Sequence, residues 1–76
     1  MAAKAFVLIE TAVGRTKEVT TALRQLEGVK SVDAVTGPYD VIAVLEEETL
    51  PEIGELVTGK INSIAGISRV VTCLVI

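Results

Sequence analysis

The residues best suited to bind a ligand lie together in one short segment, residues 36–40, with the sequence TGPYD. Gly37 lets another group approach the backbone closely, and Pro38 fixes its own φ as a turn requires. Tyr39 offers an aromatic wall with a polar tip, and Asp40 offers a carboxylate that can pair with an ammonium group. The same residue types also describe an ordinary tight hairpin, in which Asp40 accepts nearby N–H groups and Tyr39 covers the turn. Both interpretations are open at this level.

Other reactive side chains give weaker indications. Thr72 interrupts an apolar run, so its hydroxyl needs a partner, which is either a ligand or a local backbone group. Cys73 has no second cysteine or histidine to activate it, and a small buried hydrophobic role is expected. Residues 46–48, three consecutive glutamates, can attract a cation but are more typical of a solvated acidic turn. With no histidine and a single cysteine, the chain lacks the usual zinc-ligand and acid–base residue sets. We expect no catalytic residue and no metal site, and we also expect no cofactor.

Composition narrows the class of protein. A chain of 76 residues makes one domain, and at this size only about 60% of the unfolded surface is buried on folding. Seven Lys and Arg are scattered against ten Asp and Glu, and the chain has one Tyr, one Phe and no Trp, which argues against direct nucleic-acid binding. No apolar run has membrane-spanning length and no secretory signal opens the chain. We therefore expect a cytoplasmic protein without a membrane or nucleic-acid partner.

Six elements are predicted from the hydrophobic pattern. The first helix, residues 15–27, places its apolar side chains at i, i+3, i+4 and i+7, and Gly28 ends it. The second helix, residues 50–64, begins at Thr49 as N-cap with Glu52 closing the capping box. Two glycines inside this second helix suggest close packing of its backbone. The four strands are expected at residues 5–9, 29–36, 40–46 and 67–76.

This βαββαβ order predicts the α+β ferredoxin-like plait, a four-stranded antiparallel sheet with both helices on one face. The first and third strands are then central, and the second and fourth lie at the edges. Apolar residues occur on both faces of the central strands, for example Phe6 and Val7, or Ile42 and Ala43. Two helices cover one face, so we expect a second copy to cover the other and form a sheet-to-sheet dimer.

Three stretches resemble the C-terminal effector-binding (RAM) domain of the Lrp/AsnC family of transcriptional regulators. They are TGPYD at residues 36–40, LEGVKSV at residues 26–32 and IAGISRVVTCLVI at residues 64–76. The G-x-Y-D hairpin is the most specific of these motifs, and the resemblance extends over the whole chain. One departure is Ala65, where the family often has proline before the glycine of that turn. A larger departure is the missing helix-turn-helix domain, so residues 1–76 look like a single stand-alone effector domain with no DNA-binding domain.

The resemblance implies a plait dimer that assembles further, often into a ring of dimers, with a free amino acid held between adjacent dimers near the hairpin. Its ligand-binding residues would be Gly37, Pro38, Tyr39, Asp40 and Thr72. We therefore expect a non-catalytic, amino-acid-binding, oligomerising module. It would act in transcription regulation through mixed assembly with full-length family regulators, which carry DNA-binding domains.

Three alternatives remain. An ACT-like small-molecule-binding regulatory domain would pair its sheets edge to edge. A purely structural oligomerisation domain would use the hairpin for subunit contacts alone. A small enzyme of the dimeric α/β-barrel kind is disfavoured, because such chemistry commonly uses histidine or tryptophan and this chain has neither.

Overall fold

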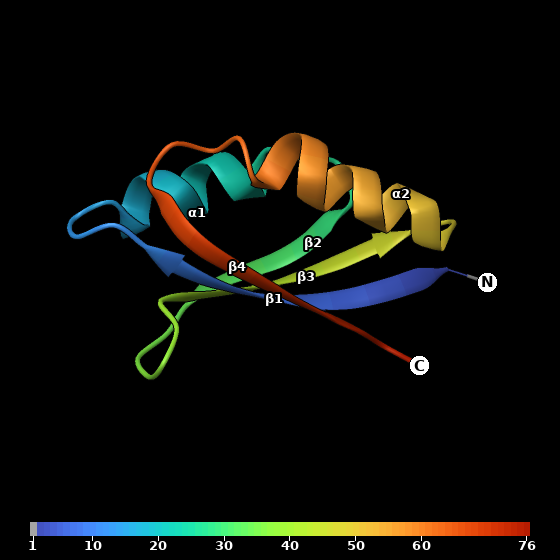
Figure 1. Ribbon diagram of the computed structural model, residues 1–76, viewed down its shortest axis with the longest axis horizontal. Helices are drawn as coiled ribbons and strands as arrows, with labels where there is room; N and C mark the ends of the chain where they lie inside the picture. Colours follow the sequence, from blue (N-terminus) through green and yellow to red (C-terminus); the bar gives the residue numbers. More distant parts are fainter. Residues whose placement is uncertain (1) are drawn as a thin grey trace.

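The computed structural model describes residues 2–76 and shows a four-stranded antiparallel sheet with its helices layered on one face (Figure 1). In chain order the elements are β1 (Ala3–Thr11), α1 (Thr16–Arg24), β2 (Val29–Ala34), β3 (Val41–Glu47), α2 (Leu50–Glu55), the π-helical segment η1 (Leu56–Ile61) and β4 (Ile67–Leu74). The strand order across the sheet is β2-β3-β1-β4. This confirms the predicted ferredoxin-like plait, with β1 and β3 in the centre and β2 and β4 at the edges.

Helix α1 packs on the sheet through the residues that its periodicity predicts. Val19 and Leu23 have no exposed surface. The helix ends at Arg24, earlier than expected, because the N–H of Leu26 donates to the carbonyl of Leu23 at 3.1 Å and tightens the last turn. Gly28 then turns the chain into β2 with φ of 92°, a conformation that favours glycine.

The second helix begins with the predicted capping box. The N–H of Glu52 donates to the hydroxyl of Thr49, and the N–H of Thr49 donates to Oε1 of Glu52 at 3.0 Å. The expectation of close packing at Gly54 and Gly59 is wrong within the subunit. A Cβ added at either glycine would meet no atom within 4 Å.

The widening of this helix into η1 has a packing reason. Leu56 and Ile61 are both buried, yet residues five apart lie about 140° apart around a regular α-helix. The wider turn, in which the N–H of Asn62 donates to the carbonyl of Val57 at 2.9 Å, brings both side chains toward the sheet. The core thus selects the π-helical turn at this point.

The core lies between the sheet and the helices. Alternate residues of β1 and β3 fill it from the sheet side: Ala5, Val7, Ile9, Val41, Ala43 and Leu45, all fully buried. Leu23 of α1, Ile53 of α2 and Ile61 of η1 close it from the helix side. The strict alternation of buried positions is the period-2 pattern of strands covered on this face.

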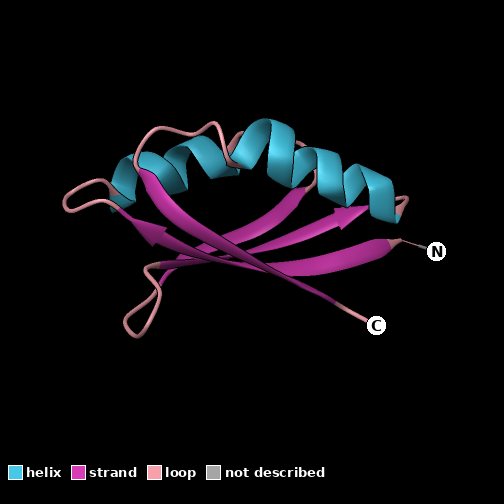
Figure 2. Ribbon diagram, in the orientation of Figure 1, coloured by secondary structure: helices cyan, strands magenta, loops and turns pink. Residues whose placement is uncertain are grey.

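The opposite face of the sheet is apolar as well, and no element within residues 2–76 covers it (Figure 2). Phe6 lies opposite Val44, and Leu8 lies opposite Ile42, in the β1–β3 register. Phe6 is 39% exposed. We call this surface the helix-free face, and we define it by Phe6, Leu8, Ile42, Val44 and Val71.

Polar contacts frame the helix-free face at its two ends. The ammonium of Lys4 lies 5.5 Å from the ring centroid of Phe6. At the other end, Arg69 pairs with Glu10 at 3.6 Å, where β4 lies opposite β1. An apolar centre with a polar rim is the usual anatomy of a protein interface. The prediction that both sheet faces are apolar is confirmed, and the dimer that would cover this face stays a prediction.

Within residues 2–76, no helix combines the length and the apolar character needed to cross a bilayer.

Candidate functional site

The predicted ligand-binding segment forms the loop between β2 and β3. Figure 1 shows that this loop projects from the end of the sheet on the side away from the helices. Thr36, Gly37 and Pro38 are exposed at its tip, whereas Tyr39 and Asp40 are partly buried at its base. A Cβ added at Gly37 would meet no atom within 4 Å, so the backbone at the tip is open to an approaching group.

Asp40 is fixed in place by three hydrogen bonds. Its N–H donates to the carbonyl of Ile9 at 2.9 Å, and its own carbonyl accepts from the N–H of Val35 at 2.9 Å. Its carboxylate oxygen Oδ2 accepts from the N–H of Thr11 at 2.8 Å. The bonds to Ile9 and Thr11 tie the base of the hairpin to the end of central strand β1, and the bond from Val35 closes the hairpin itself.

The end of β1 is itself an irregular junction. The β1–β4 register shifts between Glu10 and Thr11. The hydroxyl of Thr11 lies 2.8 Å from the hydroxyl of Thr16, the first residue of α1. The next N–H along the chain, that of Ala12, donates to the carbonyl of Gly66 at 2.7 Å, in the turn before β4. The hairpin, the start of α1 and the turn before β4 therefore meet at two consecutive residues.

Thr72 lies elsewhere in the subunit. It is an exposed residue of edge strand β4 and stands opposite Val7 of β1, whereas the hairpin leaves the sheet beside Ile9 on the β3 side. Strand β1 thus separates Thr72 from the hairpin. The structure brings Gly37, Pro38, Tyr39 and Asp40 together in one loop but does not bring Thr72 to them within one subunit.

Thr72 instead lines a shallow groove of about 260 Å³ between α2 and β4. The remaining lining residues come mainly from the helix and are largely apolar: Leu50, Ile53, Gly54, Val57, Thr58 and Leu74. Leu50 is 53% exposed, so the apolar stripe of the second helix is shared between the core and this groove. Thr72 and Thr58 are the two hydroxyl-bearing residues of this largely apolar groove, and the Thr58 hydroxyl already donates to the carbonyl of Gly54 at 2.9 Å.

The other two sequence candidates also differ from expectation. Cys73 is exposed in the subunit, because it lies opposite Phe6 on the helix-free face, so the prediction of burial is wrong here. Glu46 and Glu47 extend β3 instead of forming a turn, and Glu48 alone of the three lies beyond the strand. Neither feature brings a reactive partner to the hairpin.

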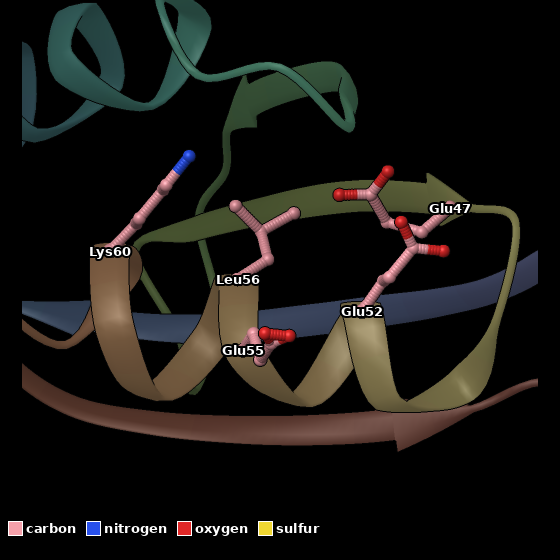
Figure 3. A pocket seen from close by; sticks show the side chains of 5 residues that line it. All are labelled: Glu47, Glu52, Glu55, Leu56 and Lys60. Atoms are coloured by element: carbon pink, nitrogen blue, oxygen red, sulfur yellow. The ribbon is translucent and has the colours of Figure 1, made fainter.

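A second cavity, of about 220 Å³, lies between the end of β3 and the second helix (Figure 3). Glu47 and Glu52 lie at one end of it, Lys60 at the other, with Leu56 between them. One carboxylate oxygen of Glu52 is already used, since it accepts from the N–H and the hydroxyl of Thr49. Within the described residues, 2–76, no three His, Cys, Asp or Glu side chains gather closely enough to hold a metal ion.

Two features escaped the sequence reasoning. The bond from Thr11 to Asp40 joins residues 29 positions apart, and no local motif announces it. The groove beside Thr72 also gave no separate signal, because its apolar lining has the same helical spacing as a core-facing stripe.

Comparison with known proteins identifies the family. The model of the Lrp/AsnC ligand binding domain matches residues 4–76. The crystal structure of TTHA0845 from Thermus thermophilus superposes with a TM-score of 0.93 at 35% identity, covering 97% of this chain and 92% of that one. The hypothetical protein PHS023 from Pyrococcus horikoshii gives a TM-score of 0.92 at 34% identity, covering 100% and 90%.

A more distant match shows the fold alone. The transcriptional regulator NMB0573 from Neisseria meningitidis, solved as an L-Met complex, has a TM-score of 0.86 at 18% identity, and the match covers 97% of this chain and 49% of the regulator. The comparison with curated proteins gives no match. With the family model spanning nearly every residue and the predicted fold confirmed, the chain belongs to the Lrp/AsnC ligand-binding domain family.

Proposed function

We propose that this protein is a regulatory module that binds a free amino acid at the hairpin of residues 36–40 and acts in the control of transcription. The observation that carries the proposal is the open hairpin tip, rigidly mounted on the central strand, in a chain whose family is defined by ligand binding. The family supports the class of function, and the open hairpin supports this choice of place. No catalytic step belongs to this proposal.

The chemistry of the hairpin suits the carboxylate and the side chain of a free amino acid. Backbone N–H groups near Gly37 can approach a carboxylate closely, because no side chain stands over the glycine. Tyr39 supplies a wall with a polar tip, and Asp40 stands at the base of the loop. The distant structural match to a regulator solved with L-Met supports the choice of an amino acid as the ligand class.

The proposed site is completed by another subunit. The hairpin tip is exposed, and its residues line neither of the two cavities described above nor a third one beside Gly28. A small ligand needs a concave site that buries most of its surface. We propose that Thr72, on the groove of a neighbouring subunit, joins the hairpin in an assembly built from sheet-to-sheet dimers, such as a ring of dimers.

The same assembly supplies a route to regulation. The module would join full-length family regulators in mixed oligomers, and those partners would contact the DNA in the cytoplasm. A ligand shifts the balance between assemblies only if it binds one of them more tightly than the other. Placement between subunits provides such a difference, because the site exists only in the assembled state.

Titration calorimetry against each proteinogenic amino acid tests the proposal. We expect one or a few binders, and we expect Tyr39→Ala to weaken their binding by about tenfold or more. Thr72→Val removes the hydroxyl but keeps a good strand former, and should weaken binding by about two- to tenfold. Val13→Ala is the matched control, because Val13 is fully exposed in the loop after β1.

The contrary result is equally clear. If no amino acid binds and the oligomer remains intact, the amino-acid-sensing proposal fails. A purely structural oligomerisation domain would then be the better description.

A further inference from the structure

Asp40 makes a bond that neither interpretation of the sequence foresaw. Its carboxylate accepts the N–H of Thr11, a residue of another strand, at 2.8 Å. This is neither a local turn contact nor a contact with a ligand. The last β1–β3 pair is Ile9 with Val41, so Thr11 lies beyond the ladder. The carboxylate thus provides the acceptor on the β3 side of β1, at the point where the β1–β3 pairing has ended.

We infer that Asp40 is a positioning residue, whose carboxylate holds the hairpin on the end of β1, and that its charge is not the counter-ion of the ligand's ammonium group. The part of this inference that concerns a ligand rests on the proposed function. The bond between Asp40 and Thr11 does not depend on a ligand. The backbone of Asp40 is bonded as well: its N–H donates to the carbonyl of Ile9, and its carbonyl accepts from the N–H of Val35. Asp40 lies at the partly buried base of the loop, whereas the exposed residues are those of the tip.

The anchor reaches beyond the hairpin. The hydroxyl of Thr11 also contacts the hydroxyl of Thr16 at the start of α1. The N–H of Ala12 donates to the carbonyl of Gly66 at 2.7 Å. Gly66 in turn sits tightly on α1, since a Cβ there would lie 3.1 Å from Cγ2 of Val19. Loss of the bond between the Asp40 carboxylate and Thr11 would therefore weaken the contacts that fix the hairpin relative to α1 and to the start of β4.

Two substitutions separate an anchor from a counter-ion. Asp40→Asn removes the charge but retains a side-chain oxygen that can accept the N–H of Thr11. Asp40→Ala removes both. Asp33→Asn and Asp33→Ala are the matched controls, because Asp33 is an exposed residue on β2 of the same hairpin.

The first measurement uses NMR to monitor the hydrogen exchange of the Thr11 amide in the absence of any ligand. We expect Asp40→Ala to speed this exchange by about tenfold or more, and Asp40→Asn and both Asp33 variants to leave it within about threefold of the original protein. Unchanged protection of Thr11 in Asp40→Ala would overturn the anchor.

The second measurement is calorimetry with whichever amino acid the panel identifies. An anchor predicts that Asp40→Asn binds within about threefold of the original protein, whereas loss of a charged hydrogen bond would cost about ten- to 150-fold. A tenfold or greater loss in Asp40→Asn, with Thr11 still protected, would overturn the inference. If no amino acid binds, the proposed function fails, and the exchange of Thr11 still decides whether the anchor exists.

Discussion

A carboxylate placed in the middle of the helix-free face should prevent sheet-to-sheet pairing. The substitution is Val44→Asp. Val44 lies on central strand β3, opposite Phe6 of β1 and Ser31 of β2, and is partly exposed in the free subunit. In the subunit alone, the new carboxylate can reach water. In the proposed dimer, it would be sealed beneath the partner's sheet.

The size of the effect follows from burial. An unpaired ion taken out of water costs several kcal/mol in a real protein, and the two-fold symmetry of a dimer buries two of them. With about 3 kcal/mol for each carboxylate, the dimer loses about 6 kcal/mol, which raises its dissociation constant by about four powers of ten. The fully buried side chains of β3 point to the opposite face, so the fold of the subunit should survive.

Sedimentation equilibrium at micromolar concentration measures the result. We expect Val44→Asp to be a folded monomer with unchanged circular dichroism. Val13→Asp, which makes the same replacement at a fully exposed loop residue, should remain a dimer. The reasoning is refuted if the two variants have the same dissociation constant, because a dimer that ignores a charge at Val44 uses another surface.

Further predictions concern the stability of the subunit, measured as the free energy of unfolding in urea. Gly28→Ala should cost about 2–4 kcal/mol, because φ is 92° and the new Cβ would lie 2.9 Å from a methyl group of buried Leu56. Gly14→Ala, with φ of 77° but no atom nearby, should cost about 1–2 kcal/mol; equal losses at the two sites would contradict the crowding argument. Gly54→Ala should instead stabilise by about 0.5–1 kcal/mol, and a loss there would show that another chain packs on this glycine. Thr49→Ala should cost about 1 kcal/mol by removing the capping box, and Thr49→Ser should restore most of it.

The architecture was predictable because it depends on local periodicity and on element order. The period of two along β1 and β3 placed Phe6 and Val7, and likewise Ile42 and Ala43, on opposite faces of the sheet. The structure then shows that Val7 and Ala43 are the residues that face the core. The βαββαβ order then placed the central and edge strands. The capping box at Thr49 was predictable for the same reason, since its partners lie within one turn.

The site was less predictable because it depends on long-range geometry. The sequence placed the hairpin, but the partner of Asp40 is decided by where β1 ends relative to β3. The π-helical turn was likewise hidden, because the sequence shows adjacent apolar residues, Leu56 and Val57, and only packing decides which is buried more deeply. The family resemblance grouped Thr72 with the hairpin as ligand-binding residues. The strand order places β1 between Thr72 and the hairpin, so they do not lie together within one subunit.

A crystal structure of the protein grown in a mixture of the proteinogenic amino acids tests the central claim most directly. We predict electron density for one amino acid beside Gly37 and Tyr39, enclosed by the hairpin of one subunit and the Thr72 groove of another. An empty hairpin in such crystals, or an amino acid bound only at a distant surface, would contradict the account.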